Sequence, residues 1–136
     1  EEVQVPSGQF IGWGPSAGQV LTIDVLSYGP AAGTDFNDVE CPQLVGVLVA
    51  PAVTYKAKGT EKIDLAEGDT VTINGGQASL KRNLLAAAPE VGDVVRISYD
   101  DVQKSSNGHD VKIFSIKVAR GAGKGVAVPA ASGDLI

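Results

Sequence analysis

The sequence contains one cysteine, one histidine and no methionine, and aromatic residues make up only 5% of its 136 residues. The single thiol, Cys41, cannot form an internal disulfide, and His109 is the one imidazole available to any histidine-assisted reaction. No apolar run approaches the roughly 20 residues that a membrane-spanning helix needs, and no basic segment followed by an apolar one opens the chain. These absences argue against disulfide-rich, secreted and membrane-spanning classes, and we expect a soluble protein of a reducing compartment.

Basic residues are missing from the first part of the chain. All eleven Lys and Arg lie at or beyond Lys56, whereas residues 1–55 contain six acids. The rest of the chain contains the other ten acids, so the net charge of −5 comes from the first part. An acidic total argues against a protein that coats duplex DNA by bulk attraction, but it leaves room for a local basic groove.

Glycine and proline are plentiful, with 17 and 7 residues, and they interrupt the sequence too often for a helical bundle. Apolar residues alternate with polar ones between them, as in Leu21, Ile23 and Val25, which is the period of a half-buried strand. We expect the first strand to stop at Pro30. The predicted strands are residues 20–26, 44–49, 70–74, 94–99 and 111–118.

One segment has helical rather than strand character. Residues 79–88 combine leucines at helical spacing with a run of three alanines, and Pro89 ends the pattern. The last two predicted strands, on either side of a polar loop, form a hairpin. Residues 55–60 are predicted to form a basic turn.

The predicted order is three strands, one helix and a two-stranded hairpin. This is the order of the OB-fold, so we predict an all-β protein with one helix, a five-stranded OB-fold-like Greek-key barrel. A β-sandwich with a surface helix is the alternative. The predicted organisation is an N-terminal arm over 1–18, the barrel over 19–119 and a flexible C-terminal tail over 120–136.

Motifs for catalysis are incomplete. The segment 14–18 matches G-x-S-x-G, but a Gly/Pro-rich arm precedes it where a nucleophile elbow needs a strand. The segment 121–125 resembles a phosphate loop that lacks its first glycine and its magnesium-binding hydroxyl. The acids of residues 35–40 lack the spacing of a calcium loop. We therefore expect neither an enzyme nor a bound cofactor or metal.

Binding of single-stranded nucleic acid needs cations for the backbone and aromatic faces for the bases. An OB barrel offers these on its second and third strands and on the neighbouring loops. Tyr99 and Phe114 alternate inward and are expected in the core, whereas Trp13 either seals the barrel or meets a ligand. Lys81 and Arg82 fit the solvated side of the helix. The predicted nucleic-acid-binding residues are Phe36, Tyr55, Lys56, Lys58, Lys104, His109, Lys112 and Lys117.

Six segments carry a resemblance to a known family. They are residues 33–36 (GTDF), 41–44 (CPQL), 78–82 (ASLKR), 89–99 (PEVGDVVRISY), 104–108 (KSSNG) and 111–118 (VKIFSIKV). Together they resemble the small OB-fold proteins of tailed phages, in particular actinobacteriophages, that bind single-stranded DNA.

The resemblance implies a sequence-tolerant single-strand binder of phage replication or recombination, acting in the host cytoplasm. Its implied partners are single-stranded DNA and replication or recombination proteins, without a membrane; a homo-oligomer stays open. The alternative function is a phage structural or assembly protein that uses the barrel for contacts with other proteins.

Overall fold

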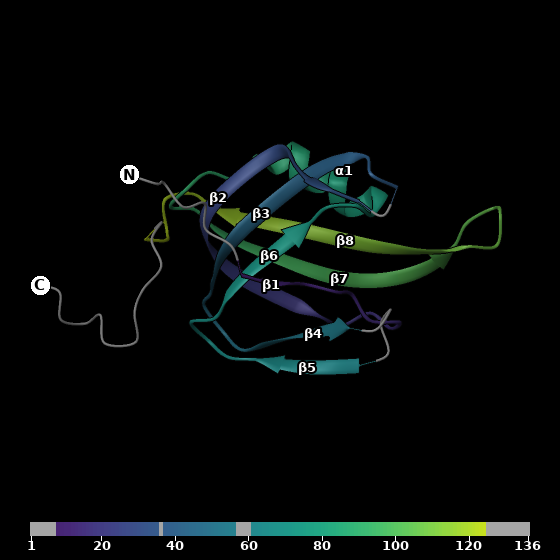
Figure 1. Ribbon diagram of the computed structural model, residues 1–136, viewed down its shortest axis with the longest axis horizontal. Helices are drawn as coiled ribbons and strands as arrows, with labels where there is room; N and C mark the ends of the chain where they lie inside the picture. The colour runs from purple at the N-terminus through teal and green to yellow at the C-terminus, as the bar shows by residue number, and fades with distance from the viewer. Residues whose placement is uncertain (1–7, 36, 57–60, 125–136) are drawn as a thin grey trace, which may run out of the picture.

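The computed structural model describes residues 8–35, 37–56 and 61–124, and within them the chain is mostly β with a single helix, as predicted (Figure 1). The strands predicted from alternation are all present, as is the helix. The elements are β1 (Gln9–Phe10), β2 (Val20–Thr34), β3 (Glu40–Leu48), β4 (Ala52–Lys56), β5 (Glu61–Leu65), β6 (Thr70–Asn74), α1 (Ala78–Ala87), β7 (Val94–Lys104) and β8 (Asp110–Ala119).

The main sheet has six strands in the order β1-β6-β3-β2-β7-β8. Neighbouring strands are antiparallel except β1 and β6, which are parallel. Within the described residues β1 and β8 are the two edges, so the sheet is not closed, and the predicted five-stranded barrel is not confirmed. A separate two-stranded sheet pairs β4 with β5. Tyr55 and Lys56, predicted to begin a basic turn, belong to β4, and the rest of that predicted turn up to residue 60 lies outside the described residues.

Strand β2 continues past Pro30, where the sequence predicted its end. Its register with β3 shifts between Gly29, which is opposite Gln43, and Gly33, which is opposite Cys41. A bulge of this kind leaves residues out of the ladder, and it therefore accommodates a proline that has no N–H to donate.

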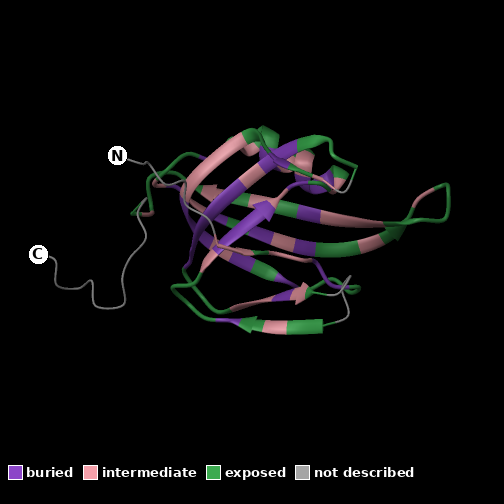
Figure 2. Cartoon of the chain, in the orientation of Figure 1, coloured by how far each residue is buried: buried purple, intermediate pink, exposed green. Residues whose placement is uncertain are grey.

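The core lies on one face of the main sheet, under α1 (Figure 2). Leu21, Ile23 and Val25 of β2 are fully buried, as the alternation predicted. Leu80 and Leu84 bring the apolar side of α1 into the same core. Strand β3, predicted as a buried central strand, lies between β6 and β2.

Helix α1 covers the outer edge of β8. The Ser79 hydroxyl accepts a hydrogen bond from the Phe114 N–H (3.0 Å), and the Asn83 amide donates one to the Phe114 carbonyl (2.7 Å). Farther along, the Arg120 guanidinium donates to the carbonyls of Ala87 and Ala88. A covered edge cannot pair with another strand, so this part of β8 is protected from edge-to-edge association.

The described part of the N-terminal arm packs on the sheet. The buried Gln19 amide accepts a hydrogen bond from the Gly14 N–H (2.6 Å) and donates to the carbonyls of Gly12 and Val53 (3.1 Å each). Burying an amide destabilises the fold unless its polar atoms are hydrogen bonded, so these three bonds fix the N-terminal arm against β4.

The end of the β7–β8 hairpin projects from the sheet. Strand β7 pairs with β2 only between Val94 and Ser98, whereas its pairing with β8 continues to Lys104. We call residues 100–113 the hairpin arm. It is a two-stranded ribbon that extends beyond the rest of the molecule (Figure 1).

Candidate nucleic-acid interface

Two hairpins carry the predicted binding residues that the structure describes. Phe36 and Lys58 lie outside the described residues. Tyr55 and Lys56 belong to β4, and the other four, Lys104, His109, Lys112 and Lys117, belong to the β7–β8 hairpin. The C-terminal ends of β4 and β7 lie toward the same end of the molecule (Figure 1).

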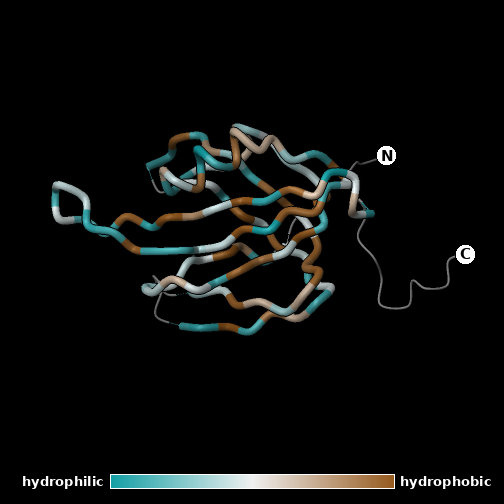
Figure 3. The backbone as a smooth tube through the Cα atoms, turned by 180° about the vertical axis from the view of Figure 1, so that it is seen from behind, coloured by the Kyte–Doolittle hydropathy of each residue, from teal (hydrophilic) through white to brown (hydrophobic). Residues whose placement is uncertain are grey.

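The tip of the hairpin arm is hydrophilic (Figure 3) and partly neutralises its own charge. Lys104 Nζ lies 2.8 Å from Asp110 Oδ1. The hydrogen bond and the charge of Lys104 lower the pKa of Asp110, and Lys112 and His109 add to this effect. His109 is exposed in the turn, where its carbonyl accepts a hydrogen bond from the Ser105 N–H (2.8 Å). Because Lys104 is in an ion pair, Lys112 and His109 are the residues of the hairpin arm that are more available to bind a phosphate.

The predicted lysines of β8 do not share one face. Lys112 lies on the face of β8 that carries Phe114, because the two residues are two positions apart. Lys117 lies on the opposite face and is exposed. Its cross-strand neighbour is Arg96, also exposed, which the sequence reasoning did not select because it saw only the polar side of a strand.

Tyr55 is in a strand and not in a turn, which limits its use as a stacking surface. Its ring packs closely against Gly14 of the N-terminal arm, where a Cβ atom would lie only 2.6 Å from a ring carbon of Tyr55. Its N–H donates to the Gly12 carbonyl (3.1 Å). Lys56, next to it, is exposed and is opposite Glu61 in the register.

Three aromatic rings form the end of the core. Trp13 contacts Tyr99 and Phe114 edge-on, with ring centroids 6.2 and 4.8 Å apart, and Tyr99 stacks on Phe114 at 5.3 Å. All three are buried, so the expected core positions of Tyr99 and Phe114 are confirmed, and Trp13 seals the core.

The exposed aromatic ring is Phe10, which the sequence reasoning left in an irregular arm. It is 59% exposed, whereas the other described aromatic residues are buried or half-buried. Its backbone is held in place, since Phe10 pairs with Thr72 of β6 and its carbonyl accepts a bond from the Thr54 hydroxyl (3.4 Å). The sequence could not predict that Phe10 is exposed, because its exposure depends on β1 pairing at the edge of the main sheet.

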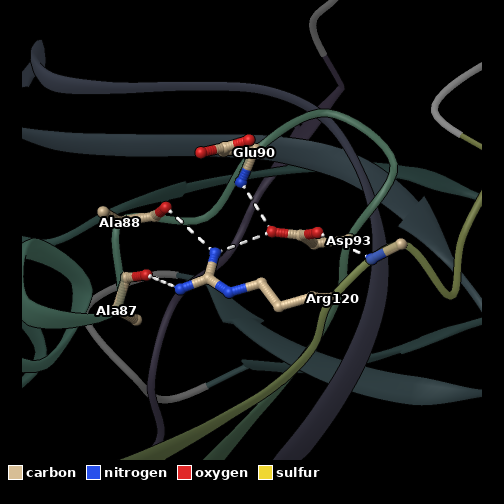
Figure 4. A network of polar contacts seen from close by, with 6 residues as sticks. Ala87, Ala88, Glu90, Asp93 and Arg120 are labelled. Carbon is tan, nitrogen blue, oxygen red and sulfur yellow. Dashed lines mark hydrogen bonds and ion pairs between the residues drawn. The ribbon is translucent and has the colours of Figure 1, made fainter.

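The buried Asp93 and the exposed Arg120 form a polar network at the end of α1 (Figure 4). Asp93 accepts bonds from the N–H groups of Glu90 and Gly121 (2.9 Å each) and from Arg120 (2.8 Å). The two backbone bonds are the main cause of a lowered Asp93 pKa, and Arg120 adds to it. Because Arg120 also binds the last carbonyls of α1, the network caps the helix.

Groups suited to catalysis lie apart. His109 is at the tip of the arm, and burial raises the pKa of the Cys41 thiol, which disfavours the reactive thiolate. Among residues 8–35, 37–56 and 61–124, no three His, Cys, Asp or Glu side chains gather as metal ligands. No helix in this part of the chain is long and apolar enough to cross a membrane.

Comparisons of the chain with protein-family models, with characterised proteins and with solved structures gave no significant match.

Proposed function

We propose that this protein binds single-stranded DNA without sequence preference and without catalysis, in phage replication or recombination. The observation that carries the proposal is the hairpin arm, which projects from the sheet and bears Lys104, His109 and Lys112. In OB-folds the loop between the last two strands is one of those that bind oligonucleotides, and the arm has this position in the chain order.

The strand arrangement supports an open OB-like core. Five neighbouring strands, β6-β3-β2-β7-β8, with α1 between β6 and β7 along the chain, keep the predicted order. We infer that α1, bonded to β8 through Ser79 and Asn83, takes the place of direct pairing between β6 and β8. The proposed function is therefore supported by the analogy between this sheet and an OB-fold and by the hairpin arm.

Phe10 supports the stacking part of the proposal. It lies on β1, beside the β6–β3 pair that corresponds to the second and third strands of an OB-fold. A base stacked on an aromatic ring contributes about 1–3 kcal/mol. Because its backbone is hydrogen bonded, little ordering entropy is lost when a base stacks on the ring.

The proposal predicts only a modest electrostatic attraction between the protein and the DNA backbone. Lys104 is paired with Asp110, which leaves Lys56, Lys112 and Lys117 as the predicted lysines without an ion pair among the described residues. Neutralising about three phosphates gives a slope of log K against log salt of about −2 for a single strand. We therefore expect binding that depends clearly but not steeply on salt.

Titration of labelled oligothymidylate of about 30 nucleotides, long enough for an OB-sized site, tests the proposal. We expect binding at micromolar protein that weakens between about 50 and about 200 mM salt. The variant Lys56→Gln/Lys112→Gln should bind more weakly than Lys81→Gln/Arg82→Gln, a matched loss of two cations on α1. No binding by the unmodified protein, or equal binding by the two variants, would contradict it.

The second candidate is a structural or assembly protein of the virion. It is favoured by the acidic first part of the chain, in which residues 1–55 contain six acids and no lysine or arginine and so offer a charged surface to basic protein partners. Recovery of the chain at high copy in purified particles, together with no affinity for nucleic acid, would select this function.

A further inference from the structure

Two cations lie directly opposite each other on neighbouring strands. Arg96 of β7 is the register partner of Lys117 of β8, and both are exposed. They lie on the face of the sheet away from the core, because their neighbours Val95 and Ile97 are fully buried on the other face.

This pair is not explained by stability. Like charges directly opposite each other in a sheet are destabilising. The ion pairs among the described residues are Lys104–Asp110 and Arg120–Asp93, so neither cation is neutralised there. A lysine on an edge strand can serve to prevent association, but Arg96 lies on β7, between β2 and β8, where that explanation does not apply.

The neighbours of the pair on the same face are three hydroxyls and one carboxylate. Thr22 of β2 is opposite Arg96, and the adjacent row on the same face holds Ser98 opposite Ser115. The row on the other side contains Asp24, whose carboxylate accepts a hydrogen bond from the Lys124 N–H (2.7 Å). Cations beside hydroxyl donors match the oxygen acceptors of a phosphate group.

The geometry points to a phosphodiester site formed by Arg96 and Lys117, with Thr22, Ser98 and Ser115 as supporting donors. The guanidinium supplies a planar pair of N–H groups and the ammonium a point charge, so that one backbone phosphate is bound between them. This site rests on the proposed function and extends it. It lies on the face of β8 opposite to Lys112. Single-stranded DNA would then contact both faces of the β7–β8 hairpin.

The test compares three proteins of equal length by oligothymidylate titration at several salt concentrations. Arg96→Gln/Lys117→Gln should bind more weakly than the unmodified protein, with a salt slope shallower by about 0.7, the value for the one phosphate contact that the pair makes. The matched control, Lys81→Gln/Arg82→Gln, loses the same charge from α1 and should keep the slope.

A stability measurement separates a binding site from a damaged fold. Lys117→Glu places opposite charges across β7–β8, so its melting temperature should not fall while its DNA affinity does. If the unmodified protein does not bind DNA, the proposed function fails and this site with it. If it binds and the Arg96/Lys117 variant behaves like the α1 control, the phosphodiester site alone is overturned.

Discussion

The ammonium of Lys104 lies 2.8 Å from the carboxylate of Asp110, across the tip of the hairpin arm. Both side chains are largely exposed, at 73% and 58%, so water screens the pair and its contribution to folding is small. For the proposed DNA binding the pair has a larger consequence, because a lysine that is already paired attracts a phosphate less strongly.

Asp110→Asn should therefore strengthen DNA binding. Releasing Lys104 adds one cation for a phosphate, so the salt slope should become steeper by about 0.7. The measurement is oligothymidylate titration against salt. Asp100→Asn, which removes the same charge from the arm without breaking this pair, is the control. Equal slopes for the two variants would mean that the ion pair does not limit the use of Lys104.

Phe10→Ala should weaken DNA binding by about 5- to 150-fold, the range for one lost stacking contact. Because the ring is 59% exposed, the free energy of unfolding should change little. Titration and urea unfolding measure the two effects separately. Unchanged affinity would remove Phe10 from the binding surface.

Phe114→Ala is the matched truncation of a buried ring. Phe114 is 3% exposed and packs against Trp13 and Tyr99, so its loss should destabilise the fold by about 3–5 kcal/mol. A cost as small as that of Phe10→Ala would contradict the arrangement of the core.

Gln19→Leu should destabilise the protein by about 3 kcal/mol, because the Gly14 N–H and the Val53 carbonyl lose the Gln19 side chain, and the Gly12 carbonyl keeps only its bond from the Tyr55 N–H. Release of the arm should also shift the fluorescence of Trp13, the single tryptophan, toward that of an exposed indole. Gln103→Leu, on the exposed arm, is the control and should alter neither property. Identical urea midpoints for the two variants would show that the Gln19 bonds do not hold the arm.

Acid should destabilise the protein partly through Asp93. Its pKa is lowered in the fold by the Gly121 and Glu90 N–H groups and by Arg120. The folded state therefore binds this proton less readily than the unfolded state. Its contribution is complete above the ordinary carboxyl pKa of about 3.9 and is lost as pH falls through the lower, folded value.

Asp93→Asn should accordingly lose less stability than the unmodified protein between about pH 5 and about pH 2. Urea unfolding across this range gives the two curves. Asp64→Asn, which removes an exposed carboxyl from β5, serves as the control. Parallel curves for the Asp93 variant and the unmodified protein would show that the network does not set the acid response.

Much of the fold could be predicted from local pattern. The alternation of Leu21, Ile23 and Val25 predicted a strand with one buried face, and all three are fully buried. The leucines and alanines before Pro89 predicted α1. Both patterns are set by side chains that are close in sequence, so they can be recognised without knowing the tertiary contacts.

Other features depended on distant contacts. Tyr55 and Lys56 were predicted to begin a turn, but they belong to β4, which pairs with β5. Strand β4 is fixed by the N-terminal arm and Gln19 through bonds at Val53, Thr54 and Tyr55. The end of β2 was placed at Pro30 because local rules stop a strand there, whereas a bulge against β3 carries it to Thr34.

The amino-acid sequence by itself determined the helix, the five strands β2, β3, β6, β7 and β8, and which residues carry charge. Only the tertiary structure decided which charges are available, since register pairs Lys104 with Asp110 and places Arg96 beside Lys117. It also decided that Trp13 is buried and Phe10 exposed. The physical reason is that alternation specifies two faces of each strand, but burial and charge pairing depend on which strand lies alongside.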